Sequence, residues 1–339
     1  MKRIDRIYET LVNLYDGKGV SAIQIASTLN LDRSNVSRDL NTLHKEGLVS
    51  KIKGKPVLFS PIHNTNQKNK FFFDSFVEKN PSLYSAVELA KAAILYPPNG
   101  MNMLILGETG VGKSMFANLV YKYGIGSNAL DSCSPFIVFN CADYTNNPQL
   151  LLSQLFGVKK GAYTGAETDR KGLIEKADGG ILFLDEVHRL PPEGQEMFFK
   201  FMDNKTFRRM GETNNERKAN VLIIAATTEN PNSVLLQTFN RRIPMVIEIP
   251  NLKNRTIEER FTLINDFFKR ESRRLEREIY VSTNSIKAFL SYNCPNNIGQ
   301  LKADIQVACA KAYANYISNK KDKISIRSLD LPTHIKEGL

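Results

Sequence analysis

The sequence predicts an α/β fold in which helices flank a mainly parallel sheet, with a winged helix-turn-helix before this domain and a helical lid after it. Three observations predict this order. Short apolar segments alternate with helical patterns between residues 103 and 249, a glycine-rich turn follows the first of them, and helical patterns take over beyond Asn254. A chain of 339 residues with 42% hydrophobic content can bury a core of that size.

The first sixty residues contain three helical patterns and a hairpin signal. Apolar residues recur at helical spacing from Ile4 to Leu14, the run breaks at 17–20, and Ser21 can cap a second helix. A third helix is expected from Arg33 to about Glu46. Residues 48–52 and 56–59 then flank a short basic turn. Three helices and a hairpin form the winged helix-turn-helix plan, whose third helix enters the major groove of DNA.

The outward face of the third helix combines phosphate-pairing cations with side chains that can read base edges. The predicted DNA-binding residues are Arg33, Ser34, Asn35, Ser37, Arg38 and Asn41, and the wing adds Lys51, Lys53 and Lys55. Residues 1–70 carry a net charge of +6, residues 71–250 carry −1, and residues 251–339 carry +6. A small helical protein-interaction domain with a solvated face is the alternative, and the charge favours DNA.

The predicted boundaries are residues 1–62 for the DNA-binding domain, 63–75 for a polar linker, 76–252 for the α/β domain and 253–339 for the lid. The expected strands are Met103–Leu106, Phe136–Asn140, Ile181–Leu184, Val221–Ala226 and Met245–Ile249. Helices are expected over 82–95, 256–277, 285–292 and 298–319. No strand is expected in the lid.

Several classes of protein are excluded by composition. The apolar runs are too short to cross a bilayer and no leader opens the chain, so we expect a cytoplasmic protein without a membrane partner. The four cysteines and four histidines are scattered without metal-ligand or disulfide spacing. The cysteines are therefore expected to be reduced core residues.

A phosphate-binding loop follows the first predicted strand and opens a helix. Its residues are Gly107, Glu108, Thr109, Gly110, Val111, Gly112, Lys113 and Ser114. The glycines let backbone N–H groups surround phosphate oxygens, Lys113 neutralises the β and γ phosphates, and the Ser114 hydroxyl binds Mg²⁺. A glycine-rich turn without this function rarely has this pattern in this context. ATP and Mg²⁺ are the expected cofactors.

Two carboxylates end the predicted strand at 181–184. Asp185 is assigned to the magnesium ion, and Glu186 is assigned to polarising the water that attacks the γ-phosphate. A buried strand delivers both groups to the carboxyl edge of the sheet, which distinguishes them from an ordinary surface pair.

The hexamer Gly161, Ala162, Tyr163, Thr164, Gly165 and Ala166 lies between these two motifs. It resembles the GAFTGA loop of the AAA+ domain in bacterial sigma-54-dependent transcription activators, with Tyr for Phe. The resemblance covers about residues 75–315 and includes PFIVFNCA, LFG and GLIEKADGGILFLDE. It implies that the hexamer contacts sigma-54, that Asn140 senses the γ-phosphate through the catalytic Glu, and that subunits form a ring, a hexamer in the family.

The chain is most similar to the LevR-like subgroup, which has an N-terminal helix-turn-helix and sugar-phosphotransferase regulatory domains after the AAA+ ATPase domain. LQTFNRRIPMVIEIP at 236–250 and PNNIGQL at 295–301 support this. The chain stops just after the lid, so it is expected to be a fragment of a longer regulator. The phosphotransferase proteins would then be partners of domains that lie outside it.

Three positions depart from the wider family. Its first arginine finger aligns with Leu235, its sensor asparagine with Thr228 and its lid arginine with Gly299. Contact with ATP across a subunit interface then rests on Arg241 and Arg242, while Lys302 is a weak substitute for the lid arginine.

The resemblance implies an enhancer-DNA-binding activator that hydrolyses ATP to remodel the closed complex of sigma-54 RNA polymerase. The alternative is a DNA-bound repressor with a weak or vestigial ATPase, which the three departures favour and the intact Lys113, Asp185 and Glu186 disfavour. A DNA-remodelling or loading ATPase would have no reason to carry residues 161–166.

Overall fold

The computed structural model describes residues 3–14, 19–29, 31–45, 48–52, 54, 56–61, 73, 75–163, 166–230, 242–319 and 322–336. The chain divides into two compact units, Met1–Lys68 and Asn69–Leu339. Each unit has its own hydrophobic core.

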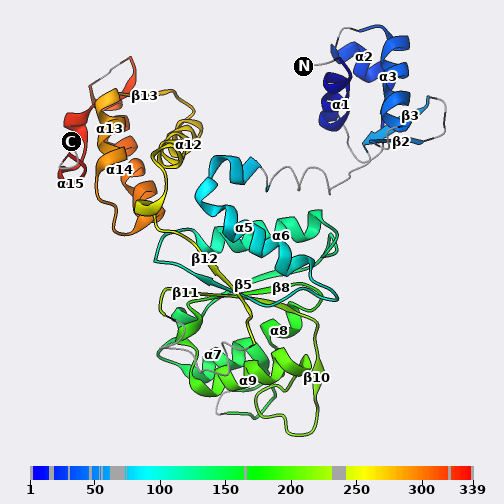
Figure 1. Ribbon diagram of the computed structural model, residues 1–339, viewed down its shortest axis with the longest axis vertical. Coiled ribbons are helices and arrows are strands. Elements are labelled where there is room, and N and C mark those ends of the chain that lie inside the picture. The colour runs from blue at the N-terminus through cyan, green and yellow to red at the C-terminus, as the bar shows by residue number, and fades with distance from the viewer. Residues whose placement is uncertain are drawn as a thin grey trace. The chain divides into compact units, whose positions relative to one another are not determined.

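The first unit is a three-helix domain with a small sheet (Figure 1). Its elements are α1 (Arg3–Leu14), β1 (Val20–Ser21), α2 (Ala22–Leu29), α3 (Arg33–Lys45), β2 (Val49–Ile52) and β3 (Leu58–Pro61). Ser21 and Gln24 cap α2 reciprocally, because the Ser21 N–H donates to Gln24 Oε1 at 2.8 Å and the Gln24 N–H donates to Ser21 Oγ at 3.4 Å. The winged helix-turn-helix prediction is confirmed, with one addition: the break predicted at 17–20 ends in strand β1, which pairs with β3.

The second unit begins with α/β structure. Its elements are η1 (Pro81–Leu83), α5 (Tyr84–Leu95), β4 (Met103–Leu106), α6 (Lys113–Gly126), β5 (Phe136–Asn140), η2 (Cys141–Tyr144), α7 (Pro148–Phe156), β6 (Gly157–Val158), β7 (Arg170–Lys171), α8 (Leu173–Lys176), β8 (Ile181–Asp185), η3 (Val187–Arg189), α9 (Pro192–Asn204), β9 (Thr206–Phe207), β10 (Arg217–Lys218), β11 (Leu222–Thr227) and β12 (Met245–Glu248).

Five parallel strands form the central sheet in the order β12-β4-β11-β8-β5. Side chains alternate between its two faces, so that Ile181 and Phe183 of β8 pack with residues of α5 and α6, whereas Leu182 and Leu184 pack with residues of α7 and α9. Figure 1 shows α5 and α6 on one side of the sheet and α7 and α9 on the other. Helices on both faces make its strands buried, as a parallel sheet requires. The predicted fold class is confirmed.

The predicted linker, residues 63–75, extends too far, because Phe73 belongs to the α/β core. This side chain is 1% exposed and packs edge-on against Tyr123 of α6, so the α/β core begins before residue 76. Cys133 corrects a second expectation, because it is exposed while the other three cysteines are buried.

The lid follows β12. It comprises η4 (Leu252–Asn254), α12 (Ile257–Leu275), β13 (Ile279–Val281), α13 (Thr283–Ser291), α14 (Asn297–Ser318), β14 (Ile324–Ile326), η5 (Ser328–Asp330) and α15 (Thr333–Lys336). The expectation of a lid without strands is wrong, since β13 and β14 pair in parallel and cover one side of its core. None of the helices in the described ranges is long and apolar enough to cross a bilayer.

Candidate functional site

The phosphate-binding loop connects β4 to α6 at the carboxyl edge of the sheet. Gly110 and Gly112 have φ values of +79° and +103°, which only glycine adopts without strain. Lys113 is 6% exposed, and its Nζ donates to the carbonyl oxygens of Gly107 at 2.9 Å and Glu108 at 3.3 Å. The buried ammonium group is therefore held at the mouth of the loop, where phosphates would lie.

Ser114 and Asp185 come together at the start of α6 and the end of β8. Ser114 Oγ donates to Asp185 Oδ2 at 3.2 Å. Burial raises the pKa of Asp185 above the ordinary range, against the opposing effect of the nearby Lys113 charge. A hydroxyl and a carboxylate side by side are oxygen ligands of the type that Mg²⁺ prefers, so these two residues fit the predicted metal.

Glu186 has a left-handed backbone, with φ +49° and ψ +49°. Its carboxylate lies between three groups: Thr228 Oγ1 donates to Oε2 at 3.1 Å, His188 Nδ1 lies 3.3 Å from the same oxygen, and Lys113 Nζ lies 3.8 Å from Oε1. Burial lowers the pKa of His188 below its ordinary value. The carboxylate predicted to act on water is thus fixed by its neighbours.

Thr228 and His188 are contacts of Glu186 that the sequence did not reveal as such. The sequence marks Thr228 only as the residue that the resemblance aligns with the family's sensor asparagine, and it shows His188 as one of four scattered histidines. The one available signal for His188 was its position two residues after Glu186.

Asn140 ends β5 directly beside Asp185 in the sheet register. Its Nδ2 donates to Asp143 Oδ1 at 3.3 Å and its Oδ1 accepts the Ala142 N–H at 3.0 Å. The described hydrogen bonds of Asn140 therefore stay within its own turn and do not include Glu186.

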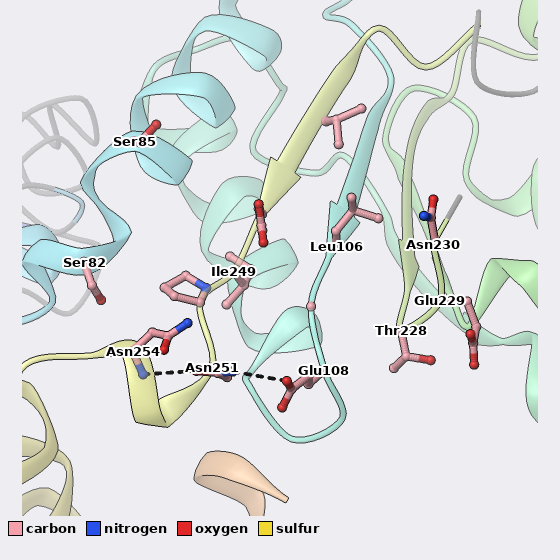
Figure 2. A pocket seen from close by; sticks show the side chains of 14 residues that line it. Ser82, Ser85, Leu106, Glu108, Thr228, Glu229, Asn230, Ile249, Asn251 and Asn254 are labelled. Atoms are coloured by element: carbon pink, nitrogen blue, oxygen red, sulfur yellow. Dashed lines mark hydrogen bonds between the residues drawn. The ribbon is translucent and has the colours of Figure 1, made fainter. Parts of the chain in front are cut away.

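The lid contacts the phosphate-binding loop through the first turn of α14. Asn297, which is 2% exposed and has φ +56°, donates from Nδ2 to Glu108 Oε2 at 2.9 Å and to the Thr109 carbonyl at 3.1 Å. Asn251 Nδ2 donates to the other oxygen of Glu108 at 3.1 Å (Figure 2). These amide hydrogen bonds lower the pKa of Glu108. No sequence pattern pointed to this contact.

Gly299 is the residue that the resemblance aligns with the family's lid arginine. Its N–H donates to the Gly110 carbonyl at 3.1 Å, and a Cβ built on it would meet Gly110 Cα at 3.4 Å. A longer side chain at 299 would therefore project at the phosphate-binding loop. The substitute candidate Lys302 is exposed on α14. Arg255, which is 8% exposed, instead reaches the loop and donates from Nη2 to the Val111 carbonyl at 3.2 Å.

A cavity of about 850 Å³ opens beside this loop. Glu108, Thr228, Glu229 and Asn251 are among its lining residues, and Figure 2 shows them around the carboxyl ends of β4, β11 and β12. The cavity lies where a nucleotide held by residues 107–114 would extend.

The 161–166 segment lies in the sequence between β6 and β7, which pair as an antiparallel two-stranded ladder. The Gly161 N–H donates to the Ala166 carbonyl at 2.9 Å and the Ala166 N–H donates to the Tyr163 carbonyl at 3.0 Å, so the described residues on either side of 164–165 are hydrogen-bonded to each other. Thr164 and Gly165 lie outside the described residues. Next to this segment, the backbones of β6 and β7 approach each other so closely that a Cβ at Gly157 would lie 2.6 Å from the Arg170 carbonyl oxygen. Gly172 and Gly211 are equally close to their neighbours, Gly211 to Ala162.

Arg241 and Arg242 are the two candidates for an arginine finger, and the structure describes only Arg242. Arg242 Nη2 lies 2.6 Å from Asp203 Oδ2, and its guanidinium lies 5.2 Å from the ring centre of Phe199. Arg241 and Leu235 lie outside the described residues. Because Arg242 is already engaged within its own chain, Arg241 is the better candidate for a contact with another subunit.

In the first unit, α3 presents Arg33, Ser34 and Arg38 as exposed side chains, while Asn35, Ser37 and Asn41 are half-buried. Lys51 Nζ donates to Asn41 Oδ1 at 2.9 Å, which ties strand β2 to this face. Lys53 and Lys55 lie outside the described residues. Asp39, on the opposite side, is buried and receives two hydrogen bonds from Arg3 at 2.8 and 3.1 Å, so α1 is fastened to α3 behind the exposed face.

A five-stranded parallel sheet, a phosphate-binding loop after its β4 strand and a helical lid define the AAA+ class of P-loop domains. Residues 76–249 match the model of the sigma-54 interaction domain, and the chain belongs to this family. Residues 5–65 match the sugar-specific transcriptional regulator TrmB. The expected resemblance to sigma-54-dependent regulators is confirmed.

Two relatives share both parts. The transcriptional regulatory protein LevR of Bacillus subtilis is 43% identical over 99% of this chain and 40% of its own length. DagR of Salmonella typhimurium is 38% identical over 93% of the chain and 36% of its own length. The chain therefore spans less than half the length of these relatives.

The structure of NtrX from Brucella abortus in complex with ATP has a TM-score of 0.61 and 22% identity, over 76% of this chain and 54% of that one. Its ADP complex has a TM-score of 0.60 and 23% identity over 75% of this chain and 54% of that one. These likenesses concern the fold.

Proposed function

We propose that this chain hydrolyses ATP with Mg²⁺ and uses the energy to activate sigma-54 RNA polymerase at promoters near the DNA bound by its first unit. The observation that carries the proposal is the meeting of Lys113, Ser114, Asp185 and Glu186 at one edge of the sheet, in a domain that also carries the 161–166 loop. Phosphate binding and activation of water then have one residue each, metal binding has two, and the loop contacts sigma-54.

In this mechanism Lys113 holds the β and γ phosphates, and Ser114 and Asp185 would hold Mg²⁺, which would supply positive charge to the phosphate oxygens. Glu186 orients the attacking water, with its carboxylate positioned by Thr228. Arg241 of a neighbouring subunit in a ring supplies the remaining positive charge. Tyr163 and Thr164 contact sigma-54.

A DNA-bound repressor with a weak ATPase is the second candidate. Gly299 in place of the lid arginine and Thr228 in place of the sensor asparagine favour it, because both changes remove groups that could contact nucleotide.

One paired assay tests the proposal. ATP hydrolysis and open-complex formation on a sigma-54 promoter are measured on the same preparation, with ATP and with a non-hydrolysable analogue. Opening that requires hydrolysable ATP supports the activator. DNA binding without polymerase-coupled hydrolysis or opening would favour the repressor.

A further inference from the structure

The turn at the start of α14 lies directly against the phosphate-binding loop. We call residues 294–299 the lid turn. Besides the two hydrogen bonds that Asn297 donates, the lid turn contacts Gly110, because the Gly299 N–H donates to the Gly110 carbonyl at 3.1 Å and a Cβ added to Gly110 would collide with the Asn296 carbonyl oxygen. The two segments touch backbone to backbone, so a displacement of the lid turn would also displace the loop.

The lid turn is held in shape from within the lid. The Asn297 N–H donates to the Cys294 carbonyl at 2.9 Å, and the Cys294 thiol donates to the Asn297 carbonyl at 3.0 Å. Cys294 Sγ also lies 3.4 Å from the hydroxyl oxygen of Tyr292. Asn297 is a non-glycine residue with φ +56°, an uncommon backbone conformation that needs support from its surroundings. Cys294 and Tyr292 supply that support.

Tyr292 is itself fixed by charged groups. Its side chain is 1% exposed, and its hydroxyl donates to Asp304 Oδ2 at 2.9 Å. Arg260 donates from Nη2 to the Tyr292 carbonyl at 2.7 Å, with its guanidinium 5.3 Å from the ring centre. Burial raises the pKa of the Tyr292 hydroxyl and of the Cys294 thiol, so both groups keep their protons and remain donors. A hydrogen bond to a carboxylate is stronger than one between neutral groups, so Asp304 determines where the tyrosine hydroxyl lies.

Asp304 also connects this network to α15, the last described helix. His334 Nε2 lies 3.2 Å from Asp304 Oδ1, the carboxylate oxygen that Tyr292 does not use. The neighbouring Ile335 is fully buried in the lid core, which anchors α15. Contacts therefore run without a gap from α15 to the lid turn and on to the phosphate-binding loop.

We propose that Asp304 is a positioning residue for nucleotide binding, which holds the lid turn against the loop through Tyr292 and Cys294 and makes the affinity for ATP depend on α15. The proposal rests on the proposed binding of ATP and adds a means of regulating it, because a segment or partner that shifted α15 would change the contact of Asn297 with the loop. A network that only stabilised the lid would leave ATP affinity unchanged when broken. None of the three positioning groups is among the described residues that line the cavity beside the loop, so they act through the lid turn.

The test measures the ATP affinity of the full chain by isothermal titration. Tyr292→Phe removes one hydroxyl and keeps the ring, and it should weaken ATP binding about fivefold, since the hydrogen bond that it loses goes to a charged group. Asp304→Ala should weaken binding at least as much. In an Asn297→Gly background, Tyr292→Phe should weaken binding by less than about twofold, because the side chain through which it acts is gone. An equal loss in both backgrounds would overturn the proposal.

The α15 end of the network is tested at His334. His334→Leu should weaken ATP binding about threefold, and His334→Gln, whose amide can donate to Asp304, should restore most of the affinity. Parent-like affinity of His334→Leu would show that ATP binding does not depend on α15 and would contradict the proposal.

The matched control is Ser285→Ala, which removes a buried lid hydrogen bond to the Ile326 carbonyl at 3.2 Å, outside this network. It should lower the unfolding temperature as Tyr292→Phe does and should bind ATP like the parent. If Ser285→Ala lost as much affinity as Tyr292→Phe, lid stability would explain both losses and the proposal would be wrong. A parent that binds ATP but opens no promoter contradicts the activator and leaves this inference intact, whereas variants that all bind ATP like the parent contradict this inference alone.

Discussion

Asn297 of the lid donates a hydrogen bond from Nδ2 to Glu108 Oε2 in the phosphate-binding loop at 2.9 Å. The same amide bonds the Thr109 carbonyl, and Asn297 Oδ1 accepts the Leu252 N–H at 2.7 Å. One buried side chain therefore joins the loop, the lid helix α14 and the connection between the α/β structure and the lid. This contact gives the lid a direct link to the phosphate-binding loop, and it lies two residues before Gly299, which the resemblance aligns with the family's lid arginine.

The first prediction concerns this link. Asn297→Gly keeps a residue that tolerates φ +56° but removes the amide, so we expect ATP to bind about tenfold more weakly, for roughly one net hydrogen bond of 1.5 kcal/mol to a charged group. Isothermal titration measures the affinity. Asn128→Gly is the matched control, because Asn128 is exposed and has φ +58°, and it should bind ATP normally. Equal affinities in the two variants would remove the lid contact from nucleotide binding.

The second prediction separates binding from hydrolysis. Lys113→Ala should weaken ATP binding by about a hundredfold, because the loop loses its buried cation. Glu186→Gln should bind ATP normally and hydrolyse it at least about a hundredfold more slowly. Both are measured by nucleotide binding and phosphate release, and chelation of Mg²⁺ should stop release in the parent. Parent-like turnover by both variants would show that the site is assigned wrongly.

Thr228 gives the third prediction. Its hydroxyl donates to Glu186 at 3.1 Å, so Thr228→Val, which has a similar shape, should lower kcat about tenfold and leave KM unchanged. Thr228→Asn should restore kcat, because an asparagine amide can donate to the same oxygen. An increase in kcat for Thr228→Val would contradict this prediction, because it would mean that the hydrogen bond restrains Glu186, and it would favour the repressor with a weak ATPase.

A fourth prediction tests whether the site is shared between subunits. Arg241→Ala should bind ATP and hydrolyse it about a thousandfold more slowly. Mixed with Glu186→Gln subunits, it should recover part of the activity, since some interfaces then have both groups intact. Arg242→Ala serves as the comparison and should lose thermal stability more than activity, because it contacts Asp203 and Phe199. No recovery in rings shown to be mixed would argue for hydrolysis within single subunits.

The fifth prediction separates ATP hydrolysis from promoter opening. Thr164→Ala and Tyr163→Ala should hydrolyse ATP at the parent rate and lose open-complex formation, since neither residue contributes to phosphate chemistry. Tyr163→Phe should be mild, because the ring supplies most of the contact area. Phosphate release and promoter opening are measured together. Full opening by both alanine variants would contradict the proposed contact with sigma-54.

Much of the α/β core could be predicted because its signals are local. Met103–Leu106 and Phe136–Asn140 are apolar runs followed by glycine or polar residues, and both strands have the predicted bounds. The lid strands β13 and β14 were missed since each has three residues, too few to show an alternating pattern. Short strands of this kind form because the lid core can cover one side of them.

The candidate site was predictable where one segment holds the whole motif, as in residues 107–114. Its lid contacts were not, because Glu108 and Asn297 lie 189 residues apart and an asparagine amide has no characteristic spacing. The position of His188 against Glu186 likewise depends on the η3 turn. Contacts of this type follow from the folded arrangement of distant segments, which a single sequence does not display.

The glycine packing under the 161–166 loop limits how this loop can be exchanged between proteins. A Cβ at 157, 172 or 211 would enter the space of a neighbouring backbone or of Ala162. A chimera that received only the hexamer would therefore join it to a backbone without these close approaches. We expect a chimera to fold correctly here only if residues 157–172 and the segment around Gly211 are transferred together. The unit to transfer in protein engineering is therefore the hexamer together with the segments that contain Gly157, Gly172 and Gly211.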